Sequence, residues 1–303
     1  MAGTTELEDL YSVIEASARQ LGVTCSRETV WPVMTTYQDL IPQSAIAFRV
    51  ETSARRGDDF SCRFTMLPKQ IDPYALALSG GLTPRTDHPV GSLSADIAAA
   101  CPIDNYGVDF GVVGGFTKTF QFFPPDELQP VSTLAGIAAV PPALAANTAF
   151  FERHGVADQV ALTGMDYEHK TFNVYFKTPD GYLLEPKNVA AVLGDIGMPE
   201  PSEQLLTLAR SAGGFYVTLN WDSPGVQRIC FSAMTKDPAA LTGGHLEPKI
   251  EQLARNAPSA DPGSDRAFIC YVASSPAGEY FKLLSFYRAQ PDVVRLWREY
   301  EDN

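Results

Sequence analysis

The sequence predicts an α+β fold in which ten antiparallel strands close into a β-barrel, with helices outside and a ligand site in the lumen. Strand-like segments occur as five pairs joined by short loops, and helical sequence precedes each pair. The second strands also repeat regularly, because Arg63, Lys118, Asn173, Arg228 and Lys282 are separated by 55, 55, 55 and 54 residues. A fixed period indicates one supersecondary unit, here a helix–strand–strand unit, used five times.

The first helix is expected over 4–22, where Leu7, Leu10, Ile14 and Ala18 fall on one stripe. A second helix is expected over 26–40. Further helices are predicted near the ranges 91–100, 141–154, 188–196, 202–212, 245–256 and 291–301. Glycine and proline punctuate the gaps between these elements, as is typical of loops.

Five antiparallel hairpins are expected between the helices. Their strands pair 44–52 with 59–67, 105–113 with 114–123, 159–167 with 170–177, 213–221 with 226–234, and 266–274 with 279–287. Successive side chains of a strand point to opposite faces. One face is mostly apolar and suits packing against helices, whereas the other mixes cations, hydroxyls and aromatic rings.

The strand 114–123 fits this pattern less well. Alternation places Lys118 on one face with Phe116, Phe120 and Phe122, and leaves three polar side chains on the presumed outer face: Thr117, Thr119 and Gln121. Closing the ten strands removes exposed edges, and a barrel of this strand number is wide enough to hold a ligand. The whole chain, 1–303, is expected to form one such domain.

Composition excludes several classes of function. The chain has 303 residues, a net charge of −13 and a pI near 4.7, so nucleic-acid backbones and anionic membranes are not expected partners. No apolar run reaches membrane-spanning length, and the acidic N-terminus is unlike a secretory signal. The five cysteines are widely spaced without a CxxC pair, which predicts free thiols and a cytoplasmic location. The four histidines lack zinc-ligand spacing.

The lumen face gathers five cations, at Arg49, Arg63, Lys118, Arg228 and Lys282. Like charges repel and their desolvation adds to the cost, so a multiply charged anion is expected among them. Diphosphate fits, because it is compact and accepts many hydrogen bonds. Further donors are Asn173, Tyr175 and Tyr216, and Asp109 and Asp166 are expected to pair with lumen cations rather than to act as bases.

Aromatic side chains fill the rest of the predicted lumen. They are Phe120, Tyr216 and Phe286, with Tyr106 as a more distant candidate. Cations beside π-faces suit an allylic diphosphate, since loss of diphosphate leaves a carbocation that aromatic faces stabilise. The basic cluster would stabilise the leaving charge as it develops.

Four segments carry a family resemblance: "GVVGGFTKTFQFF", "MDYEHKTFNVYF", "YVTLNWDSPGVQRICF" and "GEYFKLLSFY". In these segments and in the order of its elements, the chain resembles the soluble bacterial aromatic prenyltransferases of the ABBA type over essentially its whole length. The resemblance implies a PT barrel of αββα repeats with the active site inside. It also implies transfer of a dimethylallyl or geranyl group from an allylic diphosphate to an electron-rich aromatic small molecule in secondary metabolism.

The resemblance also assigns residues. By motif position, the diphosphate ligands are Lys118, Asn173, Tyr175, Arg228 and Lys282, with Arg49, Arg63, His169 and Tyr216 added to this set. Lys118, Arg228 and Tyr175 are the expected catalytic residues. Tyr216 matches a residue that shields the prenyl chain. The aromatic-substrate and prenyl pocket is expected to comprise Phe120, Leu162, Gly214, Tyr216, Ser232, Leu284 and Phe286.

One departure from the family concerns the metal. Magnesium-dependent members carry an aspartate where this chain is aligned with Ser61, and Arg63 stands two residues on. A serine does not replace a carboxylate as a magnesium anchor, whereas an arginine supplies positive charge. The sequence therefore predicts the metal-independent branch, with no cofactor and no metal ligands. A second departure is His169, where some relatives have lysine.

Two functions of other classes stay open at this point. A non-catalytic barrel could carry an aromatic metabolite, but it would have little need for five inward cations. A hydrolase or isomerase could process the diphosphate, but it would need a positioned water or base. The identity of the acceptor and the choice between a C5 and a C10 donor do not follow from the sequence. A monomer that binds only small molecules is expected.

Overall fold

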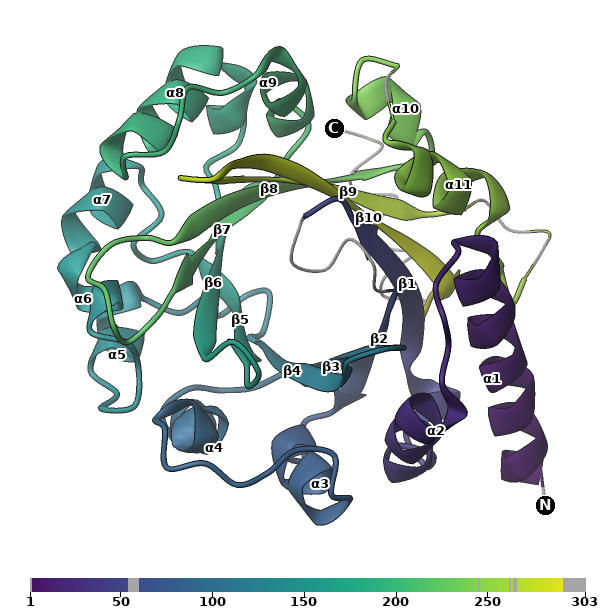
Figure 1. Cartoon of the computed structure of the whole chain (residues 1–303). Helices are drawn as coiled ribbons and strands as arrows, with labels where there is room; N and C mark the ends of the chain where they lie inside the picture. The colour runs from purple at the N-terminus through teal and green to yellow at the C-terminus, as the bar shows by residue number, and fades with distance from the viewer. Residues whose placement is uncertain (1, 54–59, 245, 262, 264–265, 291–303) are drawn as a thin grey trace.

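A computed structural model describes residues 2–53, 60–244, 246–261, 263 and 266–290. Ten antiparallel strands close into a barrel, and helices surround it (Figure 1). The α+β barrel predicted from the sequence is therefore confirmed. The helix expected at 291–301 lies outside the described residues.

The strands follow each other around the barrel in chain order. Their bounds are β1 (Ala45–Glu51), β2 (Ser61–Pro68), β3 (Asn105–Gly111), β4 (Gly115–Phe122), β5 (Val160–Asp166), β6 (Thr171–Lys177), β7 (Gly214–Leu219), β8 (Arg228–Thr235), β9 (Phe268–Ser275) and β10 (Gly278–Arg288). Every neighbouring pair is antiparallel, and β10 pairs with β1 to complete the ring. The closed ring leaves no strand edge open in this sheet.

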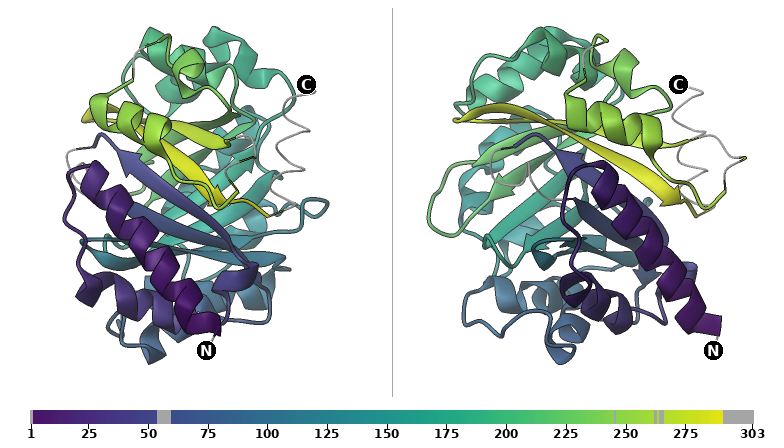
Figure 2. Two further views of the ribbon diagram at one scale, coloured as in Figure 1. Left: turned by 90° about the vertical axis from the view of Figure 1, so that its right-hand side faces the viewer. Right: turned by 45° about the vertical axis from the view of Figure 1, so that its right-hand side comes forward.

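Helices precede each strand pair, as the repeat requires. They are α1 (Ala2–Gln20), α2 (Arg27–Thr36), α3 (Pro73–Ser79), α4 (Val90–Ala100), α5 (Val131–Ala135), α6 (Ala143–Ala146), α7 (Thr148–Arg153), α8 (Pro186–Asp195), α9 (Glu203–Ala209), α10 (Pro238–Leu241) and α11 (Pro248–Asn256). Short 3-10 turns occur at η1 (Ile41–Gln43) and η2 (Tyr182–Leu184). Figure 2 shows α1 and α11 on the same side of the barrel, and α11 contacts both β1 and β10. Among the described residues, no helix combines the length and apolar character that crossing a bilayer requires.

Three helices were not expected from the sequence: α3, α5 and α10. The start of α3 has a recognisable signal, because Asp72 is its N-cap and Pro73 its first residue. The Asp72 carboxylate accepts hydrogen bonds from the backbone N–H groups of Tyr74 and Ala75. The helix expected over 141–154 is divided into α6 and α7.

The main hydrophobic core lies between the outer face of the barrel and the helices. A second, smaller apolar cluster lies inside the barrel and comprises Ala47, Tyr216, Cys230, Tyr271, Ala273 and Leu284, with Tyr175, Ile269, Tyr280 and Phe286 packed against it. The outer core therefore stabilises the barrel, and the inner cluster shapes the lumen.

The outer face of β4 differs from the expectation at one point. A bulge leaves Thr117 without a pairing position on β3, between the pairs Asp109–Lys118 and Phe110–Phe116. Phe116 therefore lies in the outer core and stacks against Tyr167 with ring centroids 5.7 Å apart. The prediction that Phe116 shares a face with Lys118 is wrong for this reason.

The polar outer residues of β4 find partners in the helical layer. Gln121 donates to the carbonyl of Ser94 at 2.7 Å, and the Thr119 and Tyr167 hydroxyls are 2.7 Å apart. These hydrogen bonds explain how polar side chains are accommodated on a buried face.

A second bulge, in β2, reverses the direction in which the side chains at the end of this strand point. Met66 has φ of 63°, and the pairing shifts between Phe64 and Leu67, so Leu67 enters the outer core in place of Met66. Tyr106, opposite Leu67, also belongs to the outer core. The expectation that Tyr106 is a more distant aromatic residue of the lumen is therefore wrong.

Candidate active site

Four charged residues alternate in sign across neighbouring strands on the lumen face. Arg63 on β2 lies opposite Asp109 on β3, Asp109 opposite Lys118 on β4, and Lys118 opposite Asp166 on β5. Arg63 donates from Nε and Nη2 to the two oxygens of Asp109, at 2.6 and 2.9 Å. Lys118 Nζ lies 3.0 Å from Asp166 Oδ2. The expected pairing of both aspartates with lumen cations is confirmed.

Arg49 joins this row from β1 and gives Asp109 a second guanidinium. Its Nη1 donates to Asp109 Oδ2 at 2.9 Å, and its buried Nε has no hydrogen-bond partner among the described residues. Burial alone would raise the pKa of Asp109, but Arg63 and Arg49 outweigh it and hold that pKa far below its usual value. Two guanidinium groups share one carboxylate, so this group keeps one positive charge.

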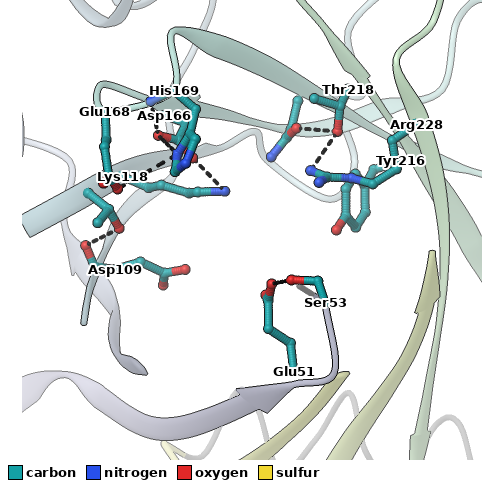
Figure 3. A network of polar contacts seen from close by, with 12 residues as sticks. Glu51, Ser53, Asp109, Lys118, Asp166, Glu168, His169, Tyr216, Thr218 and Arg228 are labelled. Atoms are coloured by element: carbon teal, nitrogen blue, oxygen red, sulfur yellow. Dashed lines mark hydrogen bonds and ion pairs between the residues drawn. The ribbon is translucent and has the colours of Figure 1, made fainter. Parts of the chain in front are cut away.

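Arg228 and Lys282 differ from the other lumen cations because hydroxyls, not carboxylates, receive their hydrogen bonds. Arg228 Nη2 donates to the Thr218 hydroxyl at 2.9 Å, and Lys282 Nζ donates to the Tyr216 hydroxyl at 2.8 Å. Within the described part of the chain, neither forms an ion pair, and the buried Nε of Arg228 has no partner. Figure 3 shows Arg228, Thr218 and Tyr216 on one side of the lumen, across from Lys118 and Asp166.

Asn173 extends the hydrogen-bond chain that begins at Arg228. The Thr218 hydroxyl donates to Asn173 Oδ1 at 2.8 Å while it accepts from Arg228. The three residues lie opposite one another on β6, β7 and β8. The Asn173 amide N–H groups are thereby directed away from Thr218, which suits hydrogen bonding to an anion.

Aromatic rings stand beside the cations. The Tyr175 and Tyr216 rings have centroids 4.3 Å apart, and Phe120 meets Tyr175 edge-on at 6.4 Å. The Arg63 guanidinium carbon lies 4.3 Å from the centroid of the Phe120 ring. Burial raises the pKa of Tyr175, so this side chain remains a neutral phenol near pH 7.

The residues expected to bind the aromatic substrate fall into two groups. Tyr216, Leu284 and Phe286 belong to the inner apolar cluster. The others are placed by strand register, since Leu162 lies opposite Tyr175, Ser232 opposite Gly214 and Phe120 opposite Gly164. Gly214 has a further reason to be glycine, because a Cβ there would lie 2.0 Å from the Phe176 carbonyl oxygen.

His169 lies at the end of the charged row with two carboxylates. Its Nδ1 is 3.2 Å from Asp166 Oδ1 and 3.6 Å from Glu168 Oε2. Among the residues that the structure describes, Asp166, Glu168 and His169 form a group whose side-chain oxygen and nitrogen atoms lie close enough together to bind one metal ion. Ser61, expected at the family's magnesium position, is buried opposite Arg49 and offers a single hydroxyl.

Several lumen residues were missed from the sequence, and alternation would have found most of them. Glu51 follows Arg49 by two positions, Thr218 follows Tyr216 by two, and Tyr280 precedes Lys282 by two. Residues two apart on a strand share a face, so each of these three lies on the lumen face with a residue already assigned to it. Tyr271, opposite Lys282 on β9, was missed as well.

Glu51 and Lys282 both have strongly shifted pKa values. Burial lowers the pKa of Lys282 to about 7, with Arg228 and Arg49 adding to the effect. Burial would raise the pKa of Glu51, but Lys282 and Arg49 outweigh it and lower the value to about 2. The cations Arg49, Arg63, Lys118, Arg228 and Lys282 then exceed the carboxylates Glu51, Asp109 and Asp166 by two charges when Lys282 is protonated.

Comparison with known proteins gives close relatives over nearly the whole chain. A 5,10-dihydrophenazine-1-carboxylate 9-dimethylallyltransferase of Streptomyces anulatus is 43% identical over 296 residues, which cover 98% of both chains. A flaviolin linalyltransferase of Streptomyces virginiae is 45% identical over 293 residues, 96% of both chains. A furaquinocin biosynthesis prenyltransferase of Streptomyces sp. (strain KO-3988) is 44% identical over 284 residues, 93% of this chain and 91% of the relative.

The family profile described as "Aromatic prenyltransferase Orf2" matches residues 5–296. This match spans all ten strands of the barrel and every lumen residue named above. The chain belongs to the aromatic prenyltransferase Orf2 family, as its barrel, its lumen cations and its relatives together indicate.

Proposed function

We propose that this protein transfers a dimethylallyl or geranyl group from an allylic diphosphate to an electron-rich aromatic small molecule, in secondary metabolism. The observation that carries the proposal is the hydroxyl-bound pair Arg228 and Lys282 beside the Tyr175–Tyr216 stack. Because both cations are hydrogen-bonded to neutral hydroxyls, no directly paired carboxylate among the described residues competes with an incoming anion for them. The aromatic faces next to them suit the apolar part of the same donor.

The diphosphate would lie among Arg228, Lys282 and Tyr216, with Asn173 and Lys118 as further donors. As the C–O bond of the donor breaks, its electron pair and the negative charge move onto the leaving diphosphate. Positioned cations stabilise this charge more strongly in the transition state than in the bound donor. Arg228 and Lys118 are therefore the proposed catalytic cations.

The allylic cation left behind needs electron-rich surroundings that are not nucleophilic. Tyr175 and Tyr216 offer π-faces, and the high pKa values caused by burial keep both phenols neutral. An aromatic carbon of the acceptor then attacks the cation and a C–C bond forms. The ring regains aromaticity by losing a proton, which the released diphosphate or water accepts. Phe120, Leu162 and Phe286 are proposed to hold the acceptor against the prenyl group.

We also propose that the reaction does not require magnesium. Arg49 and Arg63 place an uncompensated positive charge beside the lumen where the family's metal-dependent members are expected to hold an ion. The group Asp166, Glu168 and His169 has the donor types to bind a divalent cation, and this proposal gives it no part in the reaction. All the proposed ligands come from one chain, which supports a monomer. Free cysteines support the proposal that it works in the cytoplasm.

A product assay separates this function from the two alternatives. The protein is incubated with dimethylallyl or geranyl diphosphate, with and without a dihydroxynaphthalene, and products are resolved by mass spectrometry. We expect a prenylated naphthol and an equal amount of released diphosphate, both dependent on the acceptor. Prenyl alcohol formed without regard to the acceptor would identify a hydrolase, and binding without turnover of any donor across an acceptor panel would identify a carrier.

A further inference from the structure

Glu51 and Lys282 face each other across the seam where β1 meets β10. The two residues lie directly opposite in the antiparallel register, and both side chains are buried. Directly opposite side chains on one face of such a pair interact. Figure 3 shows the Glu51 side chain pointing from β1 into the space between the Lys118 side and the Arg228–Tyr216 side of the lumen.

On balance, the surroundings of Lys282 disfavour its positive charge. The titratable and charged groups around it are Arg228 and Cys230 on β8, Tyr216 on β7, Tyr271 directly opposite on β9, Arg49 and Glu51 on β1, and Tyr280 on its own strand. Burial and the two arginines favour the neutral amine, which is why the pKa of Lys282 falls to about 7. A neutral amine would be a poor ligand for diphosphate, because the charge-assisted hydrogen bond would be lost.

Glu51 is the carboxylate that opposes this effect. Asp109 is engaged by Arg49 and Arg63, and Asp166 by Lys118, whereas Glu51 receives its hydrogen bond from the neutral Ser53 hydroxyl. Glu51 interacts electrostatically with Lys282, Arg228, Arg49 and Lys118. Lys282 has no carboxylate oxygen within 4.0 Å among the described residues, so its ammonium protons stay accessible to a ligand while a nearby negative charge supports them.

We propose that Glu51 is a positioning residue that keeps Lys282 protonated for the diphosphate of the donor, and that it thereby sets the pH range in which the donor binds. The inference rests on the proposed function. Glu51 acts in two opposite ways, because its charge maintains the Lys282 ammonium but also repels the diphosphate directly. Repulsion dominates at low pH, where Lys282 is protonated in any case, and maintenance of the ammonium dominates at high pH.

The test measures the affinity for inorganic pyrophosphate by calorimetry between pH 5.5 and 9 in wild type and in Glu51→Gln. We expect the variant to bind as tightly as wild type or more tightly at pH 5.5. Its affinity should then begin to fall about one pH unit lower than that of wild type, which corresponds to about a tenfold weaker binding at high pH. The two profiles therefore cross.

Two controls assign the shift to Lys282. Glu279→Gln removes a partly buried carboxylate of the same strand, hydrogen-bonded to Ser202, and should leave the profile unchanged. In a Lys282→Met background, Glu51→Gln should no longer move the pH midpoint. NMR of ¹³Cε-labelled lysine gives a direct readout, since the pKa of Lys282 should fall in Glu51→Gln.

Parallel profiles, with the variant tighter or weaker by the same factor at every pH, would overturn the inference. So would an unchanged Lys282 titration by NMR. These outcomes are distinct from a failure of the proposed function, in which wild type itself would bind pyrophosphate at no pH. Circular dichroism on each variant confirms that the comparison is made between folded proteins.

Discussion

At the scale of single residues, the lumen is organised by its carboxylates as much as by its cations. Asp109 binds two guanidinium groups at once and is almost fully inaccessible to solvent. Removing one partner of a buried charge group leaves the others without compensation. Asp109 is therefore a structural anchor of the site rather than a candidate base.

Asp109→Asn should lower the free energy of unfolding by about 3–5 kcal/mol, the usual cost of breaking a buried ion pair. Urea unfolding followed by circular dichroism gives the value. The matched control is Glu251→Gln, which breaks an exposed pair with Arg255 and should cost less than about 1 kcal/mol. Equal losses in the two variants would show that Asp109 does not hold the cations in place.

Arg228→Ala and Lys118→Ala should each reduce turnover by about 10²–10³-fold, because both remove charge that stabilises the departing diphosphate. Steady-state kinetics with saturating acceptor measure the effect. Arg255→Ala, on the exposed face of α11, should keep wild-type turnover. Near-normal turnover in Arg228→Ala or Lys118→Ala, with donor binding confirmed, would remove the assigned roles.

Sequence reasoning at this scale found the cations and expected Asp109 and Asp166 to pair with them. It did not specify which cation each aspartate binds, nor the hydroxyls that accept hydrogen bonds from Arg228 and Lys282. The inward facing of Arg49, Arg63, Lys118, Arg228 and Lys282 followed from alternation along each strand. Asp109 on β3 binds both Arg49 on β1 and Arg63 on β2. This arrangement depends on the register between strands, which the sequence of a single strand does not specify. The hydroxyl contacts of Arg228 and Lys282 also cross from strand to strand.

At the scale of elements, the strand pairs were predicted well because their alternation is regular. Exceptions occur at bulges such as those in β2 and β4, where one extra residue reverses the facing of Met66 and Phe116. Such reversals depend on the partner strand, so the sequence of one strand does not reveal them. Short helices such as α5 and α10 lack the length that makes a periodic pattern visible.

The pairing of β6 with β7 gives a test at this scale. Gly214→Ala should destabilise the protein by about 1–3 kcal/mol, because the new Cβ would meet the Phe176 carbonyl oxygen at 2.0 Å. In α8, Gly194 has no neighbouring atom within 4 Å of an added Cβ, and Gly194→Ala should stabilise by up to about 1 kcal/mol. Thermal unfolding distinguishes the two. A harmless Gly214→Ala would mean that the strands can separate slightly without cost.

At the scale of the whole molecule, an acidic protein encloses a lumen of opposite charge. The chain carries a net charge of −13, whereas the named lumen groups have two positive charges in excess when Lys282 is protonated. The acidic exterior does not attract polyanions in general, and the site is reserved for an anion small enough to enter. This contrast explains why the net charge excludes nucleic acids as ligands, whereas it does not exclude a small anion such as diphosphate.

The proposed metal independence predicts that turnover survives excess EDTA. Arg49 and Arg63 supply fixed positive charge near the donor, so chelation should remove nothing that the reaction needs. The measurement compares initial rates in EDTA, in EDTA followed by excess magnesium, and without additions, and the three rates should agree. A rate that falls to background in EDTA and returns with magnesium would contradict the proposal and direct attention to Asp166, Glu168 and His169.

The central claim is that the diphosphate lies among Arg228, Lys282 and Tyr216, with the prenyl group against the tyrosine stack. A crystal structure with the non-reactive thio-analogue of dimethylallyl diphosphate tests it most directly. The account predicts phosphate oxygens within hydrogen-bonding distance of Arg228, Lys282 Nζ and the Tyr216 hydroxyl, and the prenyl chain on the rings of Tyr175 and Tyr216. A diphosphate bound in the lumen without contact to Arg228 and Lys282, or bound outside the barrel, would contradict it.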